Sequence, residues 1–174
     1  MLKPLPTLLL TFIGVGTAIV AGDGELSLKL VLIFITILLA AAGANGLTNY
    51  LDREIDARMQ RTRNRALPAK RIYPPEKVLP VVISLIVIGL ALAWWLHPFA
   101  FLGDLGGTLA AATWRKKVTC VYPQGVAASC APVLMGWFAV KPILSWEILL
   151  ICLMIVVWLP LHVWSLIITH RDDY

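Results

Sequence analysis

Long apolar runs dominate this sequence and decide what it can fold into. A helix that crosses a bilayer needs about 20 apolar residues, within a range of roughly 17–25. Because 59% of the residues are hydrophobic and only 14% are charged, lipid must solvate most of the surface. The sequence therefore predicts an all-α, polytopic transmembrane helix bundle that forms a single domain over residues 1–174. About six segments approach the length of a span: residues 5–22, 27–48, 77–97, 99–113, 122–140 and 146–168.

The basic residues gather beside these runs on one side. All but Lys29 and Lys141 of the 15 Lys and Arg residues fall at the amino terminus, in residues 49–77 and 115–117, or at the carboxyl end. With six spans these stretches share one membrane face, and the positive-inside rule makes that face cytoplasmic. We therefore expect a multi-pass protein of the cell membrane with a cytoplasmic amino terminus. The net charge of +5 then indicates a lipid bilayer and a small anionic substrate, and no nucleic acid.

Tryptophan positions agree with this topology. Amphipathic aromatic rings concentrate where the membrane meets water, and several tryptophans lie near the ends of the apolar runs opposite the basic loops. We expect four of them to be interfacial anchors: Trp94, Trp95, Trp137 and Trp146.

A polar stripe follows the second apolar run. On a helix, residues 45, 49, 52 and 56 lie at i, i+4, i+7 and i+11, so their side chains point in one direction. Unpaired carboxylates one turn apart repel each other, and a shared cation removes that repulsion. Carboxylate and amide oxygens suit Mg²⁺, which takes its remaining ligands from water and substrate phosphates. The stripe predicts a magnesium site with Asn49, Asp52 and Asp56 as metal ligands, and Asn45 and Asn49 are also candidate contacts to the substrate.

Cations follow the stripe on the same face. Arg61 and Arg65 lie four residues apart, and guanidinium groups bind phosphate oxygens in a bidentate way. Metal and cations together neutralise the charge that develops when diphosphate leaves an allylic carbon. The sequence thus predicts a Mg²⁺–diphosphate site, with Asp52, Asp56, Arg61 and Arg65 as catalytic candidates. Further candidate contacts to the substrate are Arg53, Lys116, Lys117 and His162.

A second acidic pair closes the chain. Asp172 and Asp173 follow the last apolar run, so we expect them on the same face as the first cluster. Two acidic clusters around one pocket would hold two or more Mg²⁺ ions against one diphosphate. The alternative interpretation is a set of ordinary cytoplasmic loops with solvated ion pairs, and a structural, hydrogen-bonded His162.

Asp104 interrupts the fourth apolar run. An ionisable group within a span is a functional candidate by default. The run is also short and rich in glycine, so we favour a second interpretation, in which Asp104 marks a tilted or half-inserted helix.

These residues resemble a known signature. The UbiA superfamily of intramembrane prenyltransferases has the pattern N-D-x-x-D-x-x-x-D, commonly followed by x-x-M-x-R-T-x-x-R-P-L. The segment "TNYLDREIDARMQRTRNRAL" is similar to it at seven positions: Asp52, Asp56, Met59, Arg61, Thr62, Arg65 and Leu67. Three later segments, "WRKKVT", "GVAASCAPVLMGW" and "WLPLHVWSLIITHRDDY", most resemble the protoheme IX farnesyltransferase family within that superfamily. The departures are Thr48, where Asn is usual, Ala66, where Pro is usual, and Pro160, which lies one place early.

The resemblance implies a fold of about nine spans, of which this chain supplies the amino-terminal two-thirds. It also implies farnesyl transfer from farnesyl diphosphate to a vinyl group of heme B, with Mg²⁺ as cofactor and water completing the new side chain. The residues implied are Asn49, Asp52, Asp56, Asp172 and Asp173 for the metal, and Arg61, Arg65, Lys116 and Lys117 for the phosphates.

Two alternatives remain at this stage. The prenyl acceptor could instead be an aromatic quinone precursor or an archaeal glycerolipid. The chain could also be a non-enzymatic membrane protein that handles cations. An ion pathway would place ionisable groups through the depth of the membrane, whereas nearly all of them lie at one face here.

Overall fold

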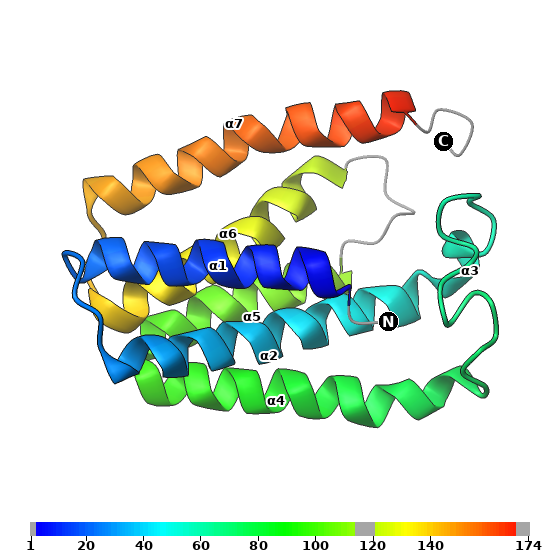
Figure 1. The fold of residues 1–174 in the computed structure, drawn as a ribbon, viewed down its shortest axis with the longest axis horizontal. Helices are drawn as coiled ribbons and strands as arrows, with labels where there is room; N and C mark the ends of the chain where they lie inside the picture. Colours follow the sequence, from blue (N-terminus) through cyan, green and yellow to red (C-terminus); the bar gives the residue numbers. More distant parts are fainter. Residues whose placement is uncertain (1–2, 114–120, 170–174) are drawn as a thin grey trace.

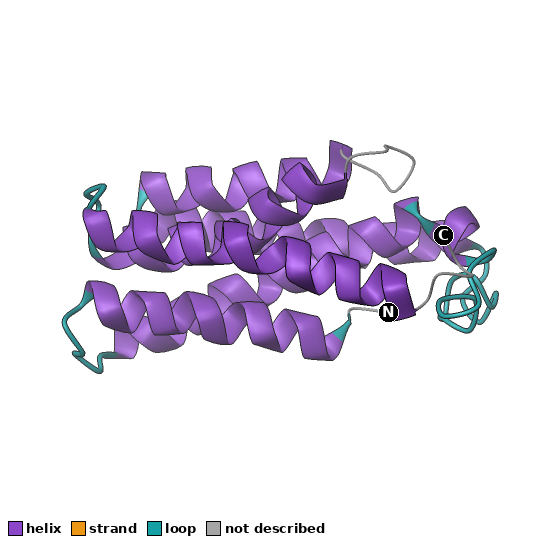
Figure 2. Ribbon diagram, turned by 90° about the horizontal axis from the view of Figure 1, so that it is seen from above, coloured by secondary structure: helices purple, strands orange, loops and turns teal. Residues whose placement is uncertain are grey.

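The computed structural model describes residues 3–113 and 121–169, and every regular element in them is a helix, so the all-α prediction is confirmed. The long helices run side by side as one bundle (Figures 1 and 2). In chain order the elements are α1 (Pro4–Ala21), α2 (Leu28–Leu51), α3 (Arg53–Asp56), the 3-10 helix η1 (Pro75–Val78), α4 (Leu79–Leu96), α5 (Pro98–Thr113), α6 (Val121–Val140) and α7 (Trp146–Thr169).

Four of the expected spans are long and apolar enough to cross a bilayer within the described residues. They are Pro4–Ala21, Leu28–Leu51, Pro75–Leu96 and Trp146–Thr169. The other two segments are also helical: α5 has 16 residues and α6 has 20, of which Gly125–Val140 form an apolar helix among the residues whose side chains the structure describes. At 1.5 Å per residue, a 16-residue helix reaches about 24 Å, which is short of a hydrocarbon core of about 30 Å. The chain is thus a multi-pass membrane protein with four candidate spans.

The helices pack through small residues. A Cβ atom on Gly136 of α6 would lie 2.1 Å from the carbonyl oxygen of Gly14 in α1. A Cβ atom on Gly89 of α4 would lie 2.9 Å from the backbone nitrogen of Ala40 in α2. In lipid, apolar side chains gain little from burial, so helices associate by close packing of this kind. The bundle is therefore fixed by contacts that leave no room for a side chain.

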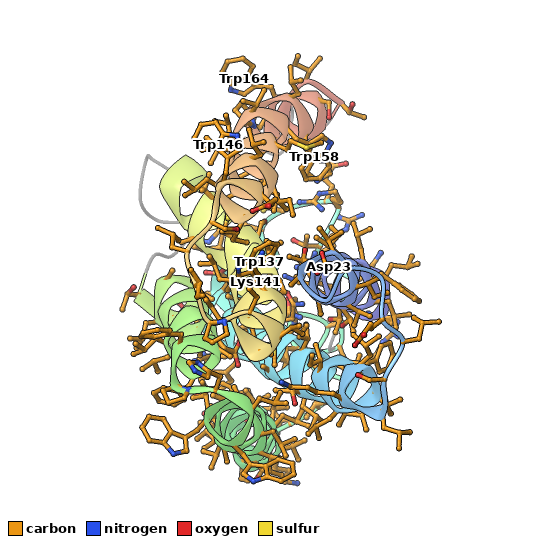
Figure 3. The ribbon with its side chains drawn as sticks, turned by 90° about the vertical axis from the view of Figure 1, so that its left-hand side faces the viewer. Asp23, Trp137, Lys141, Trp146, Trp158 and Trp164 are labelled. Atoms are coloured by element: carbon orange, nitrogen blue, oxygen red, sulfur yellow. The ribbon has the colours of Figure 1, made fainter. Side chains whose placement is uncertain are left out.

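One expected anchor lies in the core instead. Trp137 is only 1% exposed, and its indole Nε1 donates a hydrogen bond to the carbonyl oxygen of Ile143 at 3.0 Å. The Lys141 ammonium lies 5.4 Å from the centroid of the ring, and Figure 3 shows the two side chains together. The expectation that Trp137 is an interfacial anchor is wrong because the α6–α7 connection folds over its ring. The other three expected anchors, Trp94, Trp95 and Trp146, are exposed, as that role requires.

The segment between α3 and η1 forms an ordered cap. Met59, Thr62 and Leu67 are buried in it, and Leu67 packs against Val78 and Val82 at the start of the next span. Figure 1 shows this cap at the same end of the bundle as the start of α1, the end of α2 and the end of α7. The fold therefore brings the acidic stripe, the cap and the start of α1 to one end.

Candidate active site

The acidic stripe survives a break in the helix. Asp52 has φ −91° and ψ 5°, which ends regular α2, and α3 then begins at Arg53. Hydrogen bonding along the chain continues, because the Asp52 N–H donates to the Thr48 carbonyl at 2.9 Å and the Asp56 N–H donates to the Asp52 carbonyl at 2.8 Å. The helical spacing therefore holds beyond the break. The three stripe residues that follow Asn45 are all buried, with exposures of 6% for Asn49, 8% for Asp52 and 1% for Asp56.

Arg65 joins the cap to this stripe. Its Nη1 lies 2.8 Å from Asp56 Oδ2 and 3.4 Å from Asn49 Oδ1, so one guanidinium group contacts both residues. The buried Thr62 hydroxyl donates a hydrogen bond to the carbonyl oxygen of Asp56 at 2.9 Å. The Asp56 carboxylate is 1% exposed and the Arg65 side chain 31%, so the pair is half-buried and removal of Arg65 would leave a buried carboxylate without its cation. The cap thus places a cation directly against the carboxylate with the least exposure in the stripe.

These side chains line a cavity of about 190 Å³, which we call the outer cavity. Its polar lining consists of Lys3, Asn49, Asp56 and Arg65, and the cap contributes Leu67 among the apolar residues. Two cations, one carboxylate and one amide therefore face one space. This combination can bind phosphate oxygens directly and through a bridging metal ion.

A second cavity of about 180 Å³, the inner cavity, lies among α1, α2, α5 and α6. Its polar lining includes Asn45, Thr48 and Asp104, and alanine and glycine supply much of the rest. Lys3 lines both cavities, so they adjoin at the start of α1. Asn45 donates a hydrogen bond through Nδ2 to Thr7 Oγ1 at 3.0 Å. The stripe is therefore divided, with Asn45 at the inner cavity and Asn49 one turn later at the outer one.

Three predicted contacts lie elsewhere. Arg61 is exposed and lines neither cavity. Arg53 donates a hydrogen bond to the Tyr50 carbonyl at 2.9 Å and lies over the Tyr50 ring, 4.5 Å from its centroid. His162 is exposed on α7 and stacks on Trp158 with ring centroids 4.7 Å apart. The remaining predicted residues lie outside the described residues: Lys116, Lys117, Asp172 and Asp173.

Sequence reasoning also missed two residues. Lys3 lies just before the first span and so on the same membrane face as the acidic stripe, but one lysine at the end of a span usually reflects only the positive-inside rule. Thr62 was noted only as part of a signature, and its bond to Asp56 depends on how the cap folds back. Both were visible in the sequence, but no periodic pattern connects them to the stripe.

The oxygen donors fit Mg²⁺ chemically. Within the described residues, no group of three or more His, Cys, Asp or Glu side chains converges as a metal site. Mg²⁺ needs fewer protein ligands than that, because it commonly binds one or two carboxylates and completes its shell with water and substrate phosphates. Asp52 and Asp56, with the amide of Asn49, supply hard oxygen ligands of this type.

Comparison with known proteins decides the family. A family model described as the UbiA prenyltransferase family matches residues 7–174. The chain belongs to this family.

The chain is also similar to named proteins. The chain is 38% identical to the protoheme IX farnesyltransferase of Desulforudis audaxviator, over 99% of this chain and 56% of that protein. It is 33% identical to the protoheme IX farnesyltransferase of Korarchaeum cryptofilum, over 99% of this chain and 60% of the relative. The chain therefore spans little more than half the length of these curated relatives.

The fold also matches a solved structure. A UbiA homolog from Archaeoglobus fulgidus bound to DMAPP and Mg²⁺ superimposes with a TM-score of 0.71 at 15% identity. The match covers 88% of this chain and 58% of that one. At this identity the likeness establishes the UbiA-type helical fold alone.

Proposed function

We propose that this chain provides the donor-binding part of a Mg²⁺-dependent intramembrane prenyltransferase that transfers a farnesyl group from farnesyl diphosphate to heme B. The observation that carries the proposal is the convergence of Asn49, Asp56 and Arg65 on one buried cavity beside Lys3. An anionic diphosphate matches the cations, and a bridging metal ion matches the oxygen ligands. Family membership makes prenyl transfer the reaction that best suits this chemistry.

The residues have distinct roles in this proposal. Arg65 and Lys3 bind phosphate oxygens and neutralise the charge that develops on the leaving diphosphate. Asn49, Asp52 and Asp56 hold Mg²⁺, which when bound would polarise those oxygens. Burial of the stripe keeps bulk water from the reacting allylic carbon. Arg61, Lys116, Lys117, Asp172 and Asp173 remain proposed members of the same site, on a face that we propose is cytoplasmic.

Heme B is the proposed acceptor because the named relatives above are protoheme IX farnesyltransferases. The two halves of the reaction make different demands on the protein. Donor binding depends on the outer cavity, whereas the acceptor depends on walls that differ among prenyltransferases. An aromatic acid or a glycerolipid is therefore a separate outcome of the test below.

The test is direct. The detergent-purified full-length protein that contains this chain is incubated with radiolabelled farnesyl diphosphate and, in parallel reactions, with heme B, 4-hydroxybenzoate or a glycerolipid. Each reaction contains Mg²⁺ or a chelator, and the products are separated by chromatography. We expect label in the porphyrin only when Mg²⁺ is present. If no label reaches heme B with Mg²⁺ present, the heme-directed function is wrong; label in 4-hydroxybenzoate or a glycerolipid would reassign the acceptor.

Arg65→Lys tests the phosphate contact. Lysine keeps the charge, but it cannot hold Asp56 and Asn49 while also presenting a second N–H arm to a phosphate. We expect the affinity for farnesyl diphosphate to fall about 10-fold, equivalent to about 1.4 kcal/mol. Equilibrium binding of labelled donor measures this, with Arg63→Lys in the same cap as control, because Arg63 is exposed and lines neither cavity. Equal affinities in the two variants would argue against a bidentate contact.

A further inference from the structure

Asp104 of α5 is a buried acid that the proposed donor site does not use. It is 8% exposed and lines the inner cavity. Its Oδ2 atom is buried and has no hydrogen-bond partner among the residues that the structure describes. A buried polar atom without a partner costs about 1–3 kcal/mol. Asp104 Oδ2 therefore calls for a hydrogen-bond donor in the cavity.

The polar lining of the inner cavity holds both donors and acceptors, because Lys3 and Thr108 line it together with Asn45, Thr48 and Asp104. The Thr48 hydroxyl has a single proton, which it directs to the carbonyl oxygens of Ala44 and Asn45, each at 3.0 Å. The lone pairs of Thr48 therefore remain available, as does Oδ2 of Asp104. The Nδ2 group of Asn45 already donates to Thr7. An occupant beside Asp104 must therefore donate a hydrogen bond to Oδ2, and it can accept one from a donor such as Lys3 elsewhere in the same cavity.

Water has this chemistry. A polar cavity holds an ordered water when it offers about 10–15 Å³ per molecule and two to four partners, and about 180 Å³ is ample. The remainder of the lining is apolar and includes Ala44, Ala111 and Ala131, so a water there has few hydrogen-bond partners besides the polar residues named above. The inner cavity also adjoins the outer cavity at Lys3. A water held there is close to the place where diphosphate leaves.

We propose that Asp104 binds and deprotonates the water molecule that completes transfer to a vinyl group; this rests on the proposed heme-directed function. The vinyl π electrons form a bond to C1 of the farnesyl group while the C1–O bond breaks and diphosphate leaves with that electron pair. The positive charge then rests on the vinyl carbon attached to the porphyrin ring. The oxygen of the bound water bonds to this carbon, and its proton passes to the Asp104 carboxylate. The product is a secondary alcohol that carries the farnesyl chain.

The inner cavity resolves a conflict in this chemistry. Freely entering water would hydrolyse the farnesyl donor, whereas complete dryness would leave the cation on the vinyl carbon to lose a proton and form an alkene. A water held by Asp104 in the inner cavity is separate from the proposed diphosphate ligands of the outer cavity, so it can be kept for the cation on the vinyl carbon. Asp104 is therefore assigned as a catalytic residue that decides between alcohol and alkene.

The test reads the product rather than the rate. Wild-type chain, Asp104→Asn and Asp104→Leu are each incubated with heme B, farnesyl diphosphate and Mg²⁺ in oxygen-18 water, and the porphyrins are analysed by mass spectrometry. We expect labelled alcohol from the wild type. We expect the ratio of alcohol to alkene to fall about 100-fold in Asp104→Leu, the lower end of a general base contribution. In Asp104→Asn the ratio of alcohol to alkene should fall less, because the amide still binds water.

Controls separate the possible failures. Mg²⁺-dependent binding of labelled farnesyl diphosphate reports the outer cavity and the fold, and Thr36→Val alters a buried threonine that lines neither cavity. No farnesylated porphyrin from the wild type would overturn the proposed function, and this inference with it. Wild-type ratios of alcohol to alkene in both Asp104 variants would overturn this inference alone. Loss of donor binding in both variants would make Asp104 structural, which also overturns it.

Discussion

Asp56→Asn is expected to reduce prenyl transfer by about 100- to 1000-fold, the range found when one preorganised electrostatic group is removed from an active site. The substitution keeps the shape of the side chain and one oxygen for Arg65, which lies 2.8 Å away. It removes the negative charge that binds Mg²⁺, and a neutral amide is a much weaker ligand for a hard divalent cation. Transfer of radiolabel at increasing Mg²⁺ concentrations measures the loss, and excess Mg²⁺ should restore part of the rate.

Glu54→Gln is the matched control for this prediction. Glu54 lies in the same short helix, but its side chain is 74% exposed and only 3.8 Å from Arg53, a contact that water and salt screen. We expect its rate and Mg²⁺ dependence to stay within about twofold of the wild type, as for a surface ion pair. Thermal unfolding in detergent distinguishes a chemical loss from a folding defect in Asp56→Asn. A folded Asp56→Asn variant with the wild-type rate would remove Asp56 from the metal site.

The helical part of the site could be predicted because it is local. Residues 49, 52 and 56 are placed by the repeat of one helix, and the hydrogen bonds at Asp52 and Asp56 preserve that repeat across the break. Long apolar runs likewise identify spans without knowledge of their neighbours. The four candidate spans and the buried stripe follow from this kind of short-range information.

Contacts between distant segments could not be predicted in the same way. Arg65 reaches Asn49 across sixteen positions, through a cap whose path depends on where Leu67 and Val78 pack. Trp137 looked like an interfacial ring by position, yet the α6–α7 connection offers its indole N–H the carbonyl of Ile143. Sequence position fixes the depth of a residue in a span, but the direction of a side chain depends on the neighbouring helices.

Local competition explains the two predicted contacts that point elsewhere. Arg53 has an aromatic face available three residues earlier, at Tyr50, and a cation over a ring gains about 0.5–1 kcal/mol at an exposed site. His162 has the Trp158 ring one helical turn earlier. Residue type indicated phosphate or substrate binding in both cases, but a contact with a residue three or four positions earlier is formed without closing a long loop. Contacts with residues three or four positions away therefore compete with substrate binding at these two motif residues.

Gly136→Ala is expected to destabilise the bundle by about 3 kcal/mol, the upper part of the usual cost of overpacking. The new Cβ atom would lie 2.1 Å from the carbonyl oxygen of Gly14 and 2.9 Å from its carbonyl carbon. Both atoms belong to the backbone of α1, so no side-chain rotation relieves the contact and the helix itself must move. The gain in helix propensity from glycine to alanine, about 1 kcal/mol, is too small to compensate.

Gly16→Ala in α1 is the matched control, and we expect it to cause no loss of stability. No atom lies within 4 Å of a Cβ placed on Gly16, so the propensity gain stands alone and the variant should be unchanged or slightly more stable. Thermal unfolding of both variants in the same detergent measures the difference, and similar midpoints would mean that α1 and α6 do not meet through Gly14 and Gly136. The contact also matters for the site, because α1 begins directly after Lys3, which lines both cavities. A shifted α1 should therefore weaken donor binding in Gly136→Ala and leave it intact in Gly16→Ala.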